Sequence, residues 1–162
     1  MTAKGGATRS VEHALERLFR LTVNRKAHTR QTAAVGADVT RAGYAVLRCV
    51  AEAGELSLGV LARECSMDPA AAGRQVRQLE DDGLLVRSTG DDARVIVVRL
   101  TPDGQSVYER IVDVRTEYMD QVLASWTAAD RKELARLVDR LVDDMRAVPY
   151  RPAAARRARR AG

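Results

Sequence analysis

Three arginines in this chain stand where a guanidinium group could bind nucleic acid. Arg74 and Arg77 lie in a segment that begins with Asp68 and Pro69. This is a strong helix start, because Asp suits the N-cap and Pro suits the first helical position. Arg94 lies in a polar stretch between two β-prone runs. Since a guanidinium can pair with guanine in the major groove or enter a minor groove, these side chains are candidates for reading DNA.

The helix that is predicted to follow Asp68 has an apolar stripe on one side. The stripe consists of Ala72, Val76 and Leu79, which recur at helical spacing. Gly83 supplies the stop. Arg74 and Arg77 fall outside the stripe, so the sequence predicts that they face away from the core.

Small residues occupy the N-terminal half of the same helix. Ala70, Ala71 and Gly73 leave little side-chain bulk there. A helix that carries two arginines and has only small side chains near its N-terminus can lie in a DNA major groove. The alternative is a solvated helix whose arginines only keep the protein soluble.

A shorter helix is predicted before this one. Ser57 is a plausible N-cap, and the chain breaks at Ser66 and Met67. Its apolar face consists of Leu58, Val60, Leu61 and Cys65. The two helices and the break between them predict a helix-turn-helix.

Two β-prone runs, 84–87 and 95–100, follow the second helix and are separated by Gly- and Asp-rich sequence. They predict a hairpin with a polar tip. Arg94 near the tip could enter a minor groove, with its guanidinium oriented by Asp92. The alternative is a surface ion pair of little energetic value. The whole order, two helices and then a hairpin, is the plan of a winged helix-turn-helix.

Long amphipathic helices are predicted on both sides of this segment. One opens at Ser10, a second at Thr101 with Pro102 at its first position, and a third at Thr127, with Asp130 completing a near-capping box. The predicted fold is mainly α with a small β-hairpin wing, an α+β arrangement. The helical ends are longer than a small winged module needs for burial. They predict either a dimer or an intramolecular bundle in a monomer.

The charge is unevenly distributed. The chain has a formal net charge of +5, and residues 151–162 carry five arginines and no acidic residue. Residues 57–104 contain six basic side chains against eight acidic ones. A DNA-binding protein of this composition would depend on a few arginines at specific positions rather than on an overall positive charge. The tail 149–162 is predicted to be disordered, and it either adds salt-sensitive affinity for DNA or is simply solvated.

The length of 162 residues suits one domain, placed at 10–148 between a flexible N-terminus at 1–9 and the tail. No run of about 18 apolar residues is present, so no membrane association is expected. Residues 1–9 lack the apolar segment of a signal peptide, and a cytoplasmic location is expected. His13 and His28 have no ligand-like neighbours, and no catalytic constellation is recognisable. We expect no enzymatic activity, no metal site and no cofactor.

The winged segment resembles the multiple-antibiotic-resistance regulator (MarR) family of bacterial transcription factors. The segments that carry the resemblance are 40–47, 58–64, 76–86 and 92–104. The most specific of them is the last, an Asp-x-Arg followed by a strand and Leu-Thr-Pro-Asp-Gly. The close match covers 40–104, and the helical architecture extends it to about 10–146.

The resemblance implies a dimeric repressor of transcription. Helices at 10–33 and 101–146 would intertwine with those of a second copy, and the two-fold dimer would bind a pseudo-palindromic operator. By position, Arg74 would read the major groove and Arg94 the minor groove. A small-molecule effector between the dimer helices and the winged lobe would release the DNA.

Two departures from the family pattern concern the DNA contacts. Many members carry a second arginine beside the wing arginine, but this chain has Ala93. The wing is therefore expected to make one basic contact. Ala70, Ala71 and Gly73 offer no hydroxyl or amide group, so base contacts would be few and DNA shape would carry more of the specificity.

Other functions stay open at this point. Cys49 and Cys65 suggest a redox-responsive regulator, because some members of the family sense oxidants. Both cysteines fall on apolar faces, however, which favours a role as small buried hydrophobes. A winged-helix module that binds only proteins, and an architectural protein that acts through the basic tail, are the remaining alternatives.

Overall fold

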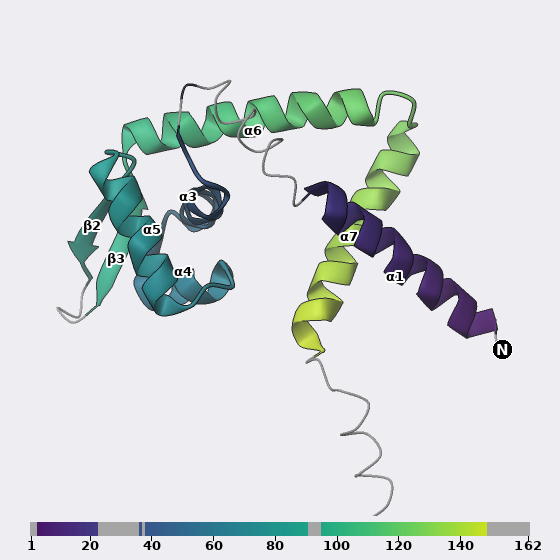
Figure 1. Ribbon diagram of the computed structural model, residues 1–162. Coiled ribbons are helices and arrows are strands. Elements are labelled where there is room, and N and C mark those ends of the chain that lie inside the picture. The colour runs from purple at the N-terminus through teal and green to yellow at the C-terminus, as the bar shows by residue number, and fades with distance from the viewer. Residues whose placement is uncertain (1–2, 23–35, 37, 91–94, 149–162) are drawn as a thin grey trace, which may run out of the picture. The chain divides into compact units, whose positions relative to one another are not determined.

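The computed structural model describes residues 3–22, 36, 38–90 and 95–148 (Figure 1). The elements are α1 (Ala3–Thr22), α3 (Arg41–Ala53), β1 (Glu55–Ser57), α4 (Leu58–Glu64), α5 (Pro69–Asp81), β2 (Leu85–Thr89), β3 (Ile96–Leu100), α6 (Pro102–Val122) and α7 (Ala128–Ala147). The chain divides after Tyr118 into two compact units, and each is described by itself. The predicted fold class, mainly α with a small β-hairpin, is confirmed.

The sheet has three antiparallel strands in the order β1-β3-β2. β3 is central, and its Val98 lies opposite Leu56 of β1 and Arg87 of β2. The hairpin of β2 and β3 agrees with the two predicted β-prone runs. β1 was not predicted, because three residues are too few to show the alternation that marks a strand.

The core of the first unit lies where α3, α4 and α5 pack against the sheet (Figure 1). Its largest fully buried side chains are Val46, Leu47, Val50, Leu61, Val76, Val98 and Ile111. Ile111 belongs to α6, so the first half of that helix is anchored in the same core. The arrangement is a helix-turn-helix followed by a hairpin, and it fixes α5 on a rigid base.

A compact junction ties the start of α6 to the end of the second helix of the helix-turn-helix. The Thr101 hydroxyl accepts a hydrogen bond from the Gly104 amide (2.9 Å) and donates one to the Gly83 carbonyl (2.7 Å). The Thr101 amide donates to the Leu84 carbonyl at 3.1 Å. A Cβ at Gly104 would collide with the same Leu84 carbonyl. Only glycine lets the two backbones approach so closely.

The N-terminal helix differs from the prediction. α1 begins at Ala3, not at Ser10, so the residues predicted as a flexible N-terminus are helical from Ala3 onward. The Ser10 hydroxyl donates to the Gly6 carbonyl (3.1 Å), four residues back, instead of capping a helix start. α1 ends at Thr22, and the rest of the predicted helix 10–33 lies outside the described residues.

The second unit contains α7, whose start agrees with the prediction. The Thr127 hydroxyl accepts from the Asp130 amide at 3.1 Å, and the Asp130 carboxylate accepts from the Thr127 amide at 3.3 Å, which completes a capping box. No residue of α7 is buried within the single chain. The apolar side chains of its predicted seam are largely exposed, among them Leu137, Val138, Val142 and Met145.

Among the described residues, no helix has the length and apolar character needed to span a membrane.

Candidate nucleic-acid interface

Both ends of α5 are set by the residues that predict them. The Asp68 carboxylate accepts a hydrogen bond from the Ala71 amide at 2.8 Å, and Pro69 occupies the first turn. At the other end Gly83 has a φ of 74°, and the Leu84 amide donates to the Leu79 carbonyl at 2.8 Å. This is the Schellman arrangement, which satisfies the last carbonyls of a helix. The predicted start and stop are therefore confirmed.

The two faces of α5 are separated as expected. Ala72, Val76 and Leu79 are buried, whereas Ala70, Arg74 and Arg77 are exposed on the opposite side. Ala71 and Gly73 are half-buried, and a Cβ added at Gly73 would meet no atom within 4 Å. The result is a low-relief surface that bears two cationic side chains.

Arg74 and Arg77 have guanidinium groups that remain available for a ligand. The ion pairs in the described part of the chain all join arginines of other elements to nearby carboxylates, and none includes Arg74 or Arg77. Arg74 also borders a groove of about 680 Å³ that Gln75, Gln78 and Asp82 help to line. A guanidinium group without a protein partner, on a helix surface with few bulky side chains, can form paired hydrogen bonds with a guanine edge or a phosphate.

A hydrogen bond between side chains links α5 to the start of α3. The Thr40 hydroxyl donates to the Gln75 side-chain oxygen at 3.0 Å and accepts from the Gly43 amide at 2.9 Å. Thr40 thus serves as the N-cap of α3 and as a link to α5. This role of Thr40 was not predicted, although a Thr directly before a helical run is a recognisable N-cap signal.

Comparison with known proteins decides the family. The model of the MarR family matches residues 39–96. The HTH-type transcriptional repressor Mb2911 of Mycobacterium bovis is 30% identical over 102 residues, which cover 62% of this chain and 73% of that protein. The chain belongs to the MarR family.

Other relatives are similar over comparable lengths. The homoprotocatechuate degradative operon repressor of Escherichia coli is 29% identical over 107 residues, 65% of this chain and 72% of that protein. The regulator YdgJ of Bacillus subtilis is 28% identical, and the match spans 63% of its length.

Solved MarR-family structures share the fold. A MarR family protein from Bacillus stearothermophilus has a TM-score of 0.69 at 22% identity, with 85% of this chain and 96% of that chain covered. NadR in complex with 4-hydroxyphenylacetate has a TM-score of 0.60 at 25% identity, with 76% and 89% covered. The winged helix-turn-helix fold of a MarR regulator is therefore established for this chain.

The MarR wing is represented by β2 and β3. The Gly90 amide donates to the Val95 carbonyl at 2.8 Å, which closes the hairpin at the base of its tip. Asp92 and Arg94 lie outside the described residues, as does the neighbouring position 93. The contact of Arg94 with a minor groove and its orientation by Asp92 remain predictions.

An ion pair joins α5 to the wing of this MarR protein. The Arg87 guanidinium of β2 contacts the Glu80 carboxylate of α5 through Nε at 2.7 Å and through a second nitrogen. The hydrogen bond from Arg87 lowers the pKa of Glu80, and the same bond raises the pKa of Arg87. This pair was not predicted, and it gives one member of the acidic run 80–82 a partner in the wing.

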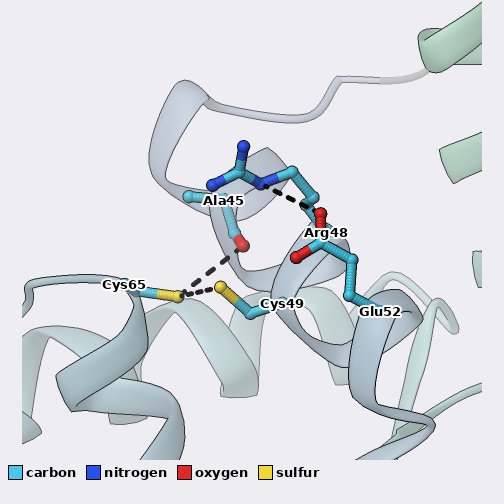
Figure 2. Close-up of polar contacts among 5 residues, drawn as sticks. All are labelled: Ala45, Arg48, Cys49, Glu52 and Cys65. Atoms are coloured by element: carbon cyan, nitrogen blue, oxygen red, sulfur yellow. Dashed lines mark hydrogen bonds and ion pairs between the residues drawn. The ribbon is translucent and has the colours of Figure 1, made fainter. Parts of the chain in front are cut away.

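The two cysteines are closer than the sequence could indicate. Cys49 of α3 is buried (8% exposed), as predicted, whereas Cys65 at the end of α4 is half-buried. Their sulfur atoms lie 3.2 Å apart (Figure 2). Neither forms a disulfide. Among the described residues, no group of three or more His, Cys, Asp and Glu side chains could hold a metal ion.

Proposed function

We propose that this protein is a dimeric repressor that binds a pseudo-palindromic operator and is released from it by a small molecule. The observation that carries this proposal is the exposed face of α5, where Arg74 and Arg77 project from a smooth surface beside the wing. Its curated relatives include transcriptional repressors. It would act as a regulator rather than an enzyme, in the cytoplasm, where bacterial DNA is accessible.

In this proposal the arginines contact DNA in two grooves. Arg74 and Arg77 would bind guanine edges or phosphates in the major groove, and Arg94 would enter the minor groove with Asp92 orienting it. Because residues 57–104 carry more acidic than basic side chains, affinity would depend on these few contacts. The small residues Ala70, Ala71 and Gly73 would permit close approach of the helix to the base edges.

Exposed apolar side chains support the dimer. They occur on α1 (Val11, Leu18 and Phe19), at the end of α6 (Tyr118, Met119 and Val122) and along α7 (Leu137, Val138, Val142 and Met145). Large apolar surfaces of this kind mark interaction sites in water-soluble proteins. A second copy would cover them. A two-fold dimer would present two α5 helices to half-sites about one DNA turn apart, roughly 34–36 Å.

Small aromatic acids are the first effectors to test. NadR was solved with 4-hydroxyphenylacetate, and BpsR of Bordetella bronchiseptica is regulated by 6-hydroxynicotinic acid. An effector that binds the DNA-incompetent form of the dimer more tightly would shift the population away from the operator-bound state.

The test is footprinting on the DNA upstream of the protein's own gene at physiological salt. The full chain is compared with a variant that lacks residues 149–162. Protection of a palindromic site by both proteins is expected. Diffuse protection that disappears with the tail would contradict the proposal and indicate an architectural protein. Absence of protection with both proteins would indicate a protein-interaction module that does not bind DNA.

A further inference from the structure

The hairpin of β2 and β3 is anchored in the core mainly at its base. Leu85 and Val98 are buried there. Thr89 and Ile96, which pair with each other nearer the tip, are exposed. β1 supports β3 only at residues 97–99. Packing therefore holds the first part of β2 and leaves the outer part with few buried contacts.

An ion pair ties the middle of β2 to α5, which lies beside it (Figure 1). The Arg87 Nε donates to the Glu80 carboxylate at 2.7 Å, and a second guanidinium nitrogen contacts the same oxygen. The hydrogen bond lowers the pKa of Glu80, so the carboxylate is charged at neutral pH. In the described part of the chain, this is the one ion pair between α5 and the hairpin.

A small rotation at the base would move the outer part of the hairpin. β2 has five residues. A strand advances about 3.3 Å per residue, so Thr89 lies roughly 13 Å from Leu85. Over that length a rotation of about 2° displaces the end by about 0.5 Å, which is the tolerance of a precisely arranged binding site. A contact at Arg87, halfway along the strand, opposes this rotation.

We propose that Glu80 and Arg87 are positioning residues, which hold the hairpin at the angle to α5 that allows both elements to contact DNA at the same time. The effect on DNA rests on the function proposed above. The hold itself does not, since it follows from the contact between the two side chains. A surface ion pair contributes little to folding stability, so variants that break it should remain folded.

The sign of the effect separates this role from a simple effect of charge. Glu80→Gln removes a negative charge from α5 and releases the Arg87 guanidinium. If charge alone mattered, both changes would strengthen the attraction to DNA phosphates. A positioning role requires the opposite result, a weaker complex with the operator, because the hairpin is no longer held.

The experiment measures the operator affinity of full-length Glu80→Gln, Arg87→Gln and the double variant by fluorescence anisotropy. We expect each single substitution to weaken binding about fivefold and the double substitution to weaken it no further, since both remove the same contact. Urea denaturation should give the same midpoint for all of these proteins.

Glu55→Gln is the matched control. It removes the same charge from the same unit, because Glu55 forms an exposed ion pair with Arg99 at 4.0 Å. That pair joins two strands whose backbones already pair at these residues. We therefore expect Glu55→Gln to bind the operator at least as tightly as the wild-type protein.

Footprinting shows which part of the complex is lost. Hydroxyl radicals report protection of the minor groove, where the wing is proposed to bind, and dimethyl sulfate reports guanine N7 in the major groove. We expect Glu80→Gln to lose protection in the minor groove and to keep it in the major groove. Loss of both in the same proportion would indicate a general structural defect and would overturn the positioning role.

Two further results would also overturn it. Operator binding by Glu80→Gln that equals or exceeds that of the wild-type protein would show that the pair does not support the complex. Additive losses in the double variant would show that the two side chains act separately, with Arg87 as a phosphate contact.

A measurement without DNA separates failure of this proposal from failure of the regulator function. Residual dipolar couplings of backbone amides give the orientation of the hairpin relative to α5 in the full-length protein. We expect the couplings of β2 and β3 to change in Glu80→Gln while those of α5 stay the same. Unchanged hairpin couplings would overturn the positioning role. If the wild-type protein protects no operator, the regulator function is wrong, and the couplings still decide whether the pair holds the hairpin.

Discussion

At the scale of single residues, arginines that pair with other segments can be contrasted with arginines that do not. Arg87, Arg99 and Arg131 form ion pairs with carboxylates of other segments. Arg74 and Arg77 have no such partner within the described residues, and they project from a helix whose other face is buried. An exposed guanidinium group without a partner in the protein is free to form hydrogen bonds with a nucleic acid.

Arg74→Ala is expected to lower operator affinity by about 1–3 kcal/mol and to relax base preference at one position, because a bidentate guanine contact is lost. Binding to a set of single-base operator variants measures both effects. Arg110→Ala is the matched control, because Arg110 is also exposed but lies on α6 and bonds to Ser106. Equal loss on operator and random DNA would show that Arg74 contacts a phosphate.

Arg94→Ala is expected to behave differently from Arg74→Ala. A minor-groove or phosphate contact contributes to binding of many sequences, so affinity should fall on all of them and the salt dependence should become shallower. Titration at several salt concentrations checks this. Loss confined to one base position would contradict the proposed role of the wing arginine.

The thiol of Cys65 leads to a prediction about pH. The folded-state pKa of about 12 lies above the ordinary value of 9.0, so the thiol form is favoured by folding. The rate at which iodoacetamide alkylates Cys65 should therefore keep rising about tenfold for each pH unit up to about pH 11, because only the thiolate reacts. Peptide mass analysis of stopped samples gives this rate. A rate that levels off near pH 9 would contradict the raised pKa.

The same shift sets the pH dependence of folding stability. Because the folded pKa is raised, the contribution of Cys65 is fully present below about pH 9 and is lost as the pH rises toward 12.

At the scale of secondary-structure elements, the end of α5 and the start of α6 meet in a tightly packed junction. Thr101 bonds to both Gly83 and Gly104, and the Leu84 backbone fills the space where a Gly104 side chain would be. This junction fixes the hairpin relative to α5. The Glu80–Arg87 ion pair reinforces the same relation from the surface.

Gly104→Ala should lower the free energy of unfolding by about 3 kcal/mol or more, since the backbone itself must move to admit the Cβ. Gly59→Ala is the matched control: Gly59 also lies in the first turn of a helix, but an added Cβ there meets no atom within 4 Å. The control is expected to be neutral or slightly stabilising. Urea denaturation of both variants measures the difference. Equal stability of the two variants would contradict the account of the junction.

The sequence predicted those elements whose boundaries depend on local chemistry. Asp68 and Pro69 set the start of α5, and Gly83 sets its end, because each acts on its own backbone neighbours. β1 was missed because three residues show no period, and α1 was placed too late because Ser10 bonds within the helix. The contact of Cys49 with Cys65 depends on the packing of α3 against α4. No local pattern contains that information.

At the scale of the whole molecule, a single copy leaves much of its apolar surface exposed. Val138 of α7 is 46% exposed, and α7 has no buried residue in the single chain. A helix with an apolar seam gains most of its stability from a partner that covers the seam. We have proposed that this partner is a second copy.

Val138→Glu is expected to dissociate the dimer, because a partner that covers this position would bury an unpaired carboxylate. Sedimentation velocity should show a monomer, and operator affinity should fall strongly because two linked half-site contacts become one. Lys132→Glu is the matched control. It makes a comparable change on the same helix, at an exposed position that helical spacing places opposite the seam. A Val138→Glu protein that stays dimeric and binds the operator normally would contradict the assignment of α7 to the dimer interface. The exposed seam would then need another partner, and the two recognition helices would have to be held together by other elements.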